Sequence, residues 1–325
     1  MPQSKTRIAL VIGAAGQVGS VAAAALRRHG WTVRGMTRRP RSADGQIEWV
    51  QGDAANAADV RRAAAGAAVI VHGAHPAGYR NWDSEGMTML ENTIAAAKAV
   101  GARIVFPGNL YNFGPDAFPA LSENSPQNPT TRKGAIRVDM ERRLRVAAEN
   151  GTPVVILRAG DFFGPGTTAA SYFSAVMVQP GKPVKRIIDP ARRGVSHAWA
   201  YLPDFGETIA QLLDRASELA DFEVFHCAGN QLNDGEMATA VAKASGKARL
   251  PVWRFPWWLV VTAQPFVRLF HEMAEMRYLW REPIRVDGRK LAAFLGKALP
   301  ATPLDTAVRE TLASLGCVPK AGGSR

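Results

Sequence analysis

A glycine-rich turn near the start of the chain constrains its fold more than any other stretch. Gly13, Gly16 and Gly19 are spaced three residues apart. They follow the apolar run Ile8 to Ile12 and precede Val18 to Arg28, which is compatible with a helix. A strand, a glycine turn and a helix in this order are typical of a nucleotide-binding βα unit. Gly13 would allow the tight turn, Gly16 would let backbone N–H groups approach a pyrophosphate, and Gly19 would let the helix pack on the strand. A glycine turn in some other βα unit is the alternative.

Strand-like and helix-like segments continue to alternate after this turn. The chain has 325 residues, 47% of them hydrophobic, enough for one large α/β domain and a smaller one. Helices are expected at Thr88 to Val100 and Gly134 to Ala148. The strands that we expect after the first are Trp31 to Met36, Ile47 to Val50, Val69 to Ala74, Arg103 to Phe106, Pro153 to Leu157 and Phe222 to Gly229.

The composition indicates the cellular compartment of the protein and the kinds of partner that it binds. The two cysteines, Cys227 and Cys317, form no disulfide framework, which favours a reducing, cytoplasmic location. The net charge of +12 is compatible with nucleic acid or an anionic membrane. However, Lys and Arg are scattered, without a basic arm or a recognition motif, so we predict neither partner. No apolar span of about 20 residues is present, and the polar start is not typical of a signal peptide.

The residues after the second expected strand indicate which cofactor binds. An acid at this point would hold the ribose hydroxyls of NAD, whereas an arginine would hold the 2′-phosphate of NADP. Arg38 and Arg39 stand here, and the first acid is Asp44. Because guanidinium groups suit phosphate, we expect NADP, with NAD as a possibility. A surface basic pair is the alternative.

Several motifs together resemble the extended and atypical short-chain dehydrogenases/reductases, the group that contains sugar-nucleotide epimerases and isoflavone-reductase-like enzymes. The glycine spacing is of this kind, and Arg158 to Gly166 is similar to the family signature Leu-Arg-x-x-x-Phe/Tyr-Gly-Pro. The resemblance extends from about residue 7 to about residue 230. It implies a Rossmann-type doubly wound parallel sheet with a small discontinuous C-terminal substrate-capping domain. Residues 1–163 plus 200–229 would bind NAD(P), and 164–199 plus 230–325 would cap the substrate. It also implies a homodimer that pairs the two expected helices.

The resemblance assigns roles to individual residues. Asp53 would hydrogen-bond the adenine amino group, or could be the N-cap of the next helix. His72 would have a structural hydrogen bond, and His75 would meet substrate or lie in a plain loop. The expected cofactor-binding residues are Gly13, Ala15, Gly16, Gln17, Val18, Gly19, Arg38, Arg39, Asp53, Ala54, His72, Gly73, Ala74, Lys133, Ala159, Gly160 and Phe162. The expected substrate residues are His75, Asp161, Phe163 and Tyr201. No metal site is expected.

The catalytic set of the family is replaced in this chain. Aligning Pro107 to Pro115 with the family segment Ser-Ser-x-x-Val-Tyr-Gly places Asn109 at the catalytic Ser. Aligning Asn128 to Glu141 with Tyr-Gly-x-Ser-Lys-x-x-x-Glu places Lys133 at the Tyr and Arg137 at the Lys. We expect Lys133 to donate the proton, Arg137 to tune it and to orient the nicotinamide ribose, and Asn109 to hold the substrate oxygen. Tyr111 and Asp161 are the next candidates. Alternatively, Lys133 and Arg137 are solvated or bind only the cofactor.

The resemblance predicts an NADP(H)-dependent oxidoreductase that transfers hydride to or from a carbonyl or hydroxyl carbon of a small, partly apolar substrate. The alternatives are an NAD(P)-binding redox sensor without turnover and an epimerase or dehydratase. The polar stretch Asp116 to Thr131, expected as a loop over the site, favours an enzyme. The aromatic stretch Val252 to Leu279 is expected to pack in the cap over substrate; membrane attachment is its alternative.

Overall fold

A seven-stranded parallel sheet organises the chain in the computed structural model, which describes residues 7–39, 41, 45–76, 82–167 and 171–319. The strand order is β11-β7-β5-β4-β1-β2-β3, and every neighbouring pair is parallel. The order reverses direction beside β1, which places a ligand crevice at the carboxyl ends of β1 and β4. The strands are β1 (Ile8–Ile12), β2 (Thr32–Thr37), β3 (Glu48–Gln51), β4 (Val69–His72), β5 (Arg103–Gly108), β7 (Val154–Ala159) and β11 (Phe222–Cys227).

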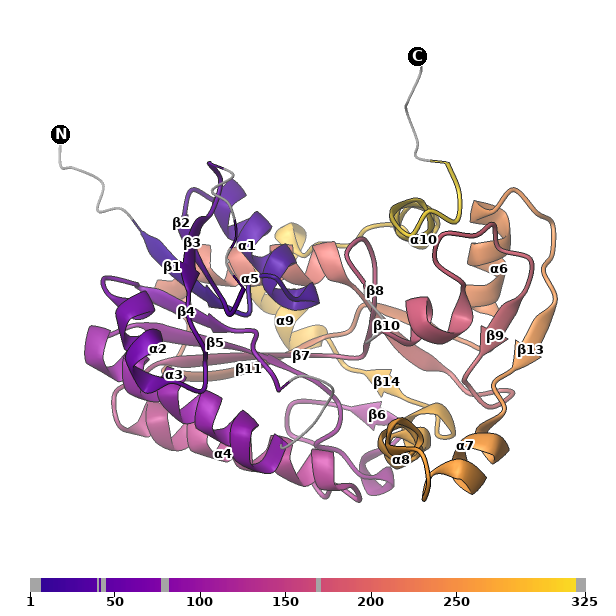
Figure 1. Cartoon of the computed structure of the whole chain (residues 1–325), viewed down its shortest axis with the longest axis horizontal. Coiled ribbons are helices and arrows are strands. Elements are labelled where there is room, and N and C mark those ends of the chain that lie inside the picture. The colour runs from indigo at the N-terminus through magenta and orange to yellow at the C-terminus, as the bar shows by residue number, and fades with distance from the viewer. Residues whose placement is uncertain (1–6, 40, 42–44, 77–81, 168–170, 320–325) are drawn as a thin grey trace, which may run out of the picture.

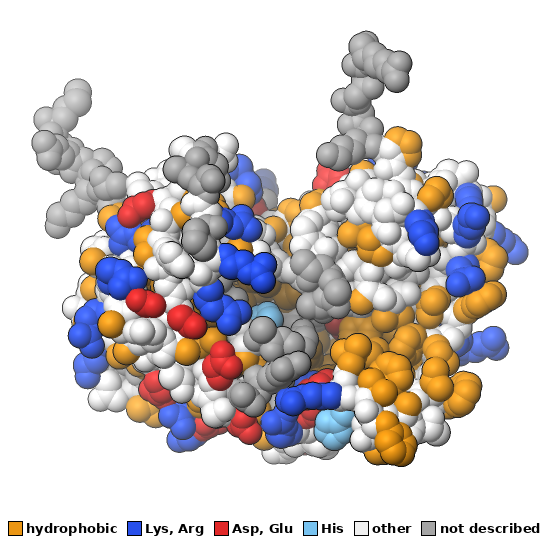
Figure 2. Space-filling view, viewed as in Figure 1, with side chains coloured by type: hydrophobic (Ala, Val, Ile, Leu, Met, Phe, Trp, Pro, Cys, Tyr) orange, Lys and Arg blue, Asp and Glu red, His pale blue; other side chains and the backbone are white. Residues whose placement is uncertain are grey.

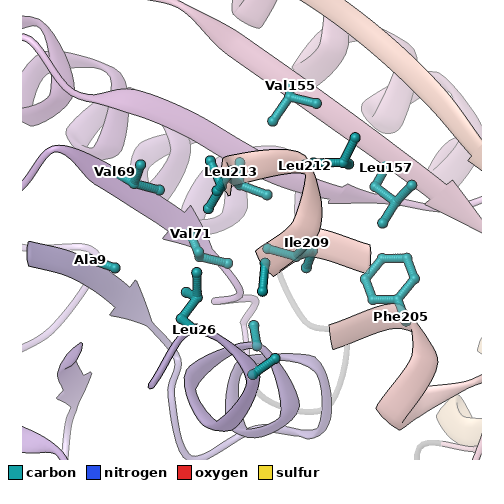
Figure 3. Close-up of a cluster of buried hydrophobic side chains, with 14 of the residues drawn as sticks. Ala9, Leu26, Val69, Val71, Val155, Leu157, Phe205, Ile209, Leu212 and Leu213 are labelled. Carbon is teal, nitrogen blue, oxygen red and sulfur yellow. The ribbon is translucent and has the colours of Figure 1, made fainter. Parts of the chain in front are cut away.

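Helices cover both faces of this sheet because its strands are apolar on both sides. In β1, Ala9 and Val11 belong to the core on one face, and Leu10 and Ile12 to the core on the other. The first face carries α1 (Gln17–Arg28), α5 (Leu202–Asp214) and α9 (Arg289–Leu295). Figure 3 shows the part of this core in which Leu26 of α1 and Phe205, Ile209, Leu212 and Leu213 of α5 lie on the strands. The second face carries α2 (Ala57–Ala64), α3 (Met87–Val100) and α4 (Arg132–Glu149) (Figure 1).

A second, smaller core lies beyond the carboxyl ends of β5 and β7 (Figure 1). Its sheets are short: β8 (Asp161–Phe163), β10 (His197–Tyr201) and β12 (Asn230–Leu232) form one, and β9 (Ile187–Asp189) pairs with β13 (Val252–Arg254). Its helices are α6 (Glu236–Ala244), α7 (Trp257–Ala263), α8 (Arg268–Glu275) and α10 (Leu304–Ser314). The remaining pair is β6 (Ala120–Leu121) with β14 (Arg285–Val286).

Short helical turns connect these elements. Those of the 3-10 type are Pro115–Ala117, Ala216–Glu218, Arg277–Trp280 and Gly296–Ala298. Those of the π type are Trp82–Gly86 and Phe173–Met177.

The doubly wound parallel sheet expected from the sequence is confirmed, and each expected strand is present within a few residues. The division into two domains remains a prediction. One segment of the expected cap, α9, packs Leu291 and Leu295 against the central sheet, in the same core as Phe225.

The stretch Asp116 to Thr131 does not lie over the crevice as expected. None of its residues lines either of the two cavities described below. It is held instead by the pairing of β6 with β14, and the Glu123 carboxylate accepts a hydrogen bond of 2.8 Å from the backbone N–H of His226.

Candidate active site

The turn between β1 and α1 requires glycine at two positions. Gly13 has a φ of +77°, and a Cβ there would lie 2.7 Å from the carbonyl oxygen of Gly73. A Cβ on Gly19 would lie 2.2 Å from the carbonyl oxygen of Gly13. The turn and the close helix–strand contact expected from the sequence are therefore both present.

The N-terminus of α1 faces the crevice through Gly16. Gly16 is the N-cap of α1, and among the described residues no side chain caps this end of the helix. It lines both cavities of the crevice. A helix end with a partial positive charge and backbone N–H groups at a glycine turn fits the pyrophosphate of a dinucleotide.

Two adjoining cavities follow the carboxyl edge of the sheet, and both are lined by Gly16, Gly73, Ala74 and His75. The first, of about 310 Å³, extends toward the smaller core, and the second, of about 260 Å³, toward β2 and β3. Together they provide one elongated site for a two-part ligand. Of the expected cofactor residues, the first cavity is also lined by Gln17, Val18, His72, Ala159, Gly160 and Phe162, and the second by Gly13, Ala15, Arg38, Asp53 and Ala54.

Arg38 and Asp53 lie together in the second cavity, as an adenosine site would require. Arg38 follows β2 directly, and Arg39 is not among the lining residues. The N-cap of α2 is Asn56, whose side chain accepts hydrogen bonds from the backbone N–H groups of Ala58 and Asp59. This excludes the alternative that Asp53 is the N-cap of α2.

His72, at the end of β4, is buried in the wall of the first cavity. Its Nδ1 lies 2.8 Å from Oγ1 of Thr93, and its ring stacks on Phe106 with a centroid separation of 5.8 Å. Burial, assisted by the nearby positive charge of Arg137, lowers the pKa of His72 to about 3. The ring is therefore neutral at physiological pH.

Asn109, Tyr111 and Arg137 come together in the first cavity. Oδ1 of Asn109 accepts a hydrogen bond of 3.0 Å from the backbone N–H of Tyr111, which fixes the turn after β5. The Arg137 guanidinium lies over two rings, 5.0 Å from the centroid of Trp82 and 5.2 Å from that of Phe106. These contacts hold a planar cation at the cavity wall.

Lys133 takes a different direction from Arg137, although both are on α4. Gly134 sets the helix close to the turn after β5, because a Cβ there would lie 2.3 Å from the carbonyl oxygen of Tyr111. Lys133 is not among the residues that line the first cavity. Its Nζ lies 2.6 Å from Oε2 of Glu272 and 3.5 Å from Oε2 of Glu275, both on α8, and only 4% of its side chain is exposed. The ammonium expected to donate a proton is thus engaged by the carboxylates of α8.

His197 is a titratable residue of this cavity that the sequence did not indicate. Its Nε2 lies 2.8 Å from Oδ2 of Asp161, and its ring stacks on Trp280 with a centroid separation of 3.8 Å. Asp161 and His197 both line the first cavity. A buried histidine beside a carboxylate is an arrangement that handles protons. The one sequence signal for His197 is that it is polar, whereas the rest of its strand, β10, is apolar.

Two of the expected substrate residues lie away from the cavities. Phe163 is fully buried in the smaller core, against Phe173 and Trp199. Tyr201 is also buried there, and its hydroxyl donates a hydrogen bond to the Glu310 carboxylate. Neither lines the first or the second cavity. Among the described residues, no group of three or more His, Cys, Asp or Glu side chains could hold a metal ion.

Comparisons with known proteins agree with this architecture. The crystal structure of a candidate epimerase from Burkholderia cenocepacia J2315 is similar, with a TM-score of 0.78 and 22% identity over 96% of this chain and 99% of that one. The UDP-glucuronic acid 4-epimerase from Bacillus cereus, solved with UDP-glucuronic acid and NAD, matches with a TM-score of 0.72 and 17% identity, over 95% of this chain and 98% of that one. At these identities the likeness shows the fold alone.

A curated relative matches in sequence over a shorter span. The uncharacterized protein y4nL of Sinorhizobium fredii (strain NBRC 101917 / NGR234) is 32% identical over 146 residues. This match covers 42% of the chain and 41% of the relative, so the chain spans about two fifths of that protein's length. The model of the NAD dependent epimerase/dehydratase family matches residues 9–228, which include the whole glycine turn and, apart from Ile8, all seven strands of the central sheet. The chain belongs to the NAD dependent epimerase/dehydratase family.

Proposed function

We propose that the protein is an NADP(H)-dependent oxidoreductase that transfers hydride to or from a carbonyl or hydroxyl carbon of a small, partly apolar substrate. The observation that carries this proposal is the pair of adjoining cavities that meet at Gly16. One contains Arg38 and Asp53, and the other combines apolar walls with Asn109, Arg137 and the Asp161–His197 pair. A cleft with apolar walls and a few convergent polar groups is the usual form of a small-molecule site.

The two ends of the cofactor are assigned by the residues present. Arg38 would hold the 2′-phosphate of the adenosine, and Asp53 the adenine amino group. The nicotinamide end would extend into the first cavity, past His72 and Gly160. When bound there, the cofactor supplies or accepts the hydride. The cofactor seen with the similar B. cereus epimerase is NAD; the preference for NADP in this chain is proposed from Arg38.

We assign the substrate oxygen to Arg137 and Asn109. Both line the cavity, and both present N–H groups that can stabilise a developing negative charge on oxygen. Tyr111 completes this wall. The proton passes to or from that oxygen through Asp161, which is hydrogen-bonded to His197 and retains a 23% exposed side chain.

Lys133 has a positioning role in this scheme rather than that of the proton donor. Its ion pairs join the first turn of α4 to α8, and the same α4 carries Arg137 one turn later. Burial of an ion pair fixes two elements relative to each other, because its separation would leave charges unpaired in the interior.

Cofactor titration followed by a screen of carbonyl substrates tests the proposal. We expect NADPH to bind, and to be oxidised in the presence of a small ketone or aldehyde with an apolar group. Cofactor binding without any turnover across the screen would favour the redox-sensor alternative. Interconversion of nucleotide sugars without net cofactor consumption would instead favour the epimerase alternative, which the family membership supports.

A further inference from the structure

An exposed apolar surface lies at the tip of the hairpin formed by α7 and α8. Phe266 is 89% exposed, Trp258 70% and Leu269 63%. Leu259 and Val267 complete this surface, which we call the α7–α8 patch. Figure 2 shows hydrophobic side chains gathered at the lower right, where Figure 1 draws the two helices. Apolar surface of this extent on a folded protein marks a contact with something outside it.

The hairpin is apolar on both of its faces, but the chain covers only one. Trp257 and Val260 point into the smaller core, where Trp257 Nε1 donates a hydrogen bond of 2.8 Å to the carbonyl oxygen of Pro190. Trp258 and Leu259 are their neighbours in sequence and face outward. A short helix that is apolar all round requires cover on each side. Packing within the cap, expected from the sequence for this aromatic stretch, therefore holds for Trp257 but not for the exposed Trp258 and Phe266.

Positive charge borders one side of the patch. The chain has no Asp or Glu between residues 237 and 271, or between 162 and 188. These segments supply β13, α7 and the first half of α8, together with the stretch that leads into β9. Because β9 and β13 pair, the basic stretches that lead into them lie close together, and Figure 2 shows blue side chains at the right of the molecule, above the patch. The exposed cations of these segments are Lys182, Lys185, Arg186, Lys243, Lys247, Arg249 and Arg268, of which Lys243 is paired with Asp305 on α10.

We propose that the α7–α8 patch docks on the surface of an anionic lipid bilayer. Tryptophan and phenylalanine insert at the boundary between headgroups and acyl chains, while surrounding lysines and arginines pair with anionic headgroups. The hairpin and its basic border have this composition, and a net charge of +12 adds long-range attraction. The association is peripheral, since none of the described helices is both long and apolar enough to cross a bilayer.

Vesicle flotation of the full chain tests this proposal. We expect binding to vesicles of phosphatidylcholine mixed with phosphatidylglycerol, weak binding to phosphatidylcholine alone, and release at high salt. The triple variant Trp258→Ser, Phe266→Ser, Leu269→Ser should bind at least about tenfold more weakly, because insertion scales with apolar area. The triple variant Lys185→Ser, Arg249→Ser, Arg268→Ser should lose roughly 100-fold, since each surface cation contributes about fivefold.

Matched controls distinguish the contribution of the patch to vesicle binding from general effects of charge and of folding. Arg61→Ser, Lys98→Ser, Lys297→Ser removes the same charge from exposed positions elsewhere and should bind almost as the wild type does. All variants should keep the wild-type melting temperature and NADPH affinity. Equal binding by every variant, or no binding to anionic vesicles, would overturn the proposal. So would light scattering in which the wild type is a dimer and the apolar triple variant a monomer, because a second copy would then cover the patch.

Discussion

Nζ of Lys133 lies 2.6 Å from Oε2 of Glu272, and this contact joins the start of α4 to α8 across 139 residues of sequence. Both side chains are less than 10% exposed. The position that resembles a catalytic tyrosine in sequence therefore serves as the attachment point of a helix from the smaller core.

Removal of this ammonium is expected to destabilise the fold. Lys133→Met leaves Glu272 buried without its main partner, which costs about 3–5 kcal/mol. The double variant Lys133→Met, Glu272→Gln removes both charges and should recover much of this loss. Urea unfolding measures the difference. A Lys133→Met variant of wild-type stability that has lost all turnover would instead restore the proton-donor role expected from the sequence.

Arg38 is expected to determine the cofactor preference. An arginine–phosphate contact contributes about 1.5–3 kcal/mol, so Arg38→Ala should weaken NADPH binding about 10- to 150-fold. NADH binding should change little. Arg39→Ala is the control, because Arg39 does not line the cavity. Calorimetry in which wild-type NADPH and NADH affinities are equal would contradict the assignment.

The Asp161–His197 pair is expected to handle the proton. Asp161→Asn should lower kcat about 10²- to 10⁴-fold, and His197→Gln should change the pH profile of kcat, with NADPH affinity almost unchanged in both. Tyr201→Phe should keep wild-type KM, because Tyr201 is buried away from the cavity. Unaltered turnover in Asp161→Asn, measured with an identified substrate, would move the role to Tyr111.

Two buried histidines are expected to make the fold sensitive to mild acid. Burial, with Arg137 for His72 and Arg158 for His226, lowers the pKa of each to about 3. An unfolded histidine has a pKa of about 6.5 and binds a proton first, so stability is fully present above that pH and falls as the pH drops toward about 3. Each histidine contributes a slope of about 1.4 kcal/mol per pH unit in this window.

Urea unfolding at about pH 7 and about pH 5 measures this slope. His72→Gln should reduce it by about half of the combined contribution, whereas His271→Gln, at an exposed position, should leave it unchanged. A slope that His72→Gln does not alter would show that other groups dominate the acid response.

A homodimer that pairs α3 and α4 remains a prediction. Val146, 47% exposed on α4, is a large apolar side chain on the outer side of this helix. Val146→Glu should convert a dimer into a monomer by placing like charges against each other across a two-fold axis. Light scattering at micromolar concentration is the measurement, and a monomeric wild type would contradict the pairing.

Local sequence signals predicted the central fold because the contacts that they imply join residues close to each other in the sequence. Gly13 and Gly19 lie within one βα turn, and the strands follow from continuous apolar runs such as Val154–Ala159. The cavity walls at Asn109 and Arg137 were also indicated by motif position, since they follow β5 and the α4 register set by Gly134.

Long-range side-chain pairing could not be predicted in the same way. Glu272 and Glu275 are in an aromatic segment with no recognisable motif, so nothing in the sequence connects them with Lys133. The role proposed for His197 depends on its contact with Asp161, 36 residues earlier in the sequence, and on Trp280, which stacks on its ring. Tyr201 and Phe163 were expected at the substrate, but their side chains pack in the smaller core.

Helix α8 has one side at Lys133 and the other in the apolar surface that ends in Phe266 and Leu269. A displacement of this helix must therefore change both sites together. By thermodynamic reciprocity, any ligand whose affinity depends on the position of α8 at one site alters affinity at the other by the same factor. Occupation of the α7–α8 patch and binding beside Arg137 on α4 would then be linked through the Lys133–Glu272 contact.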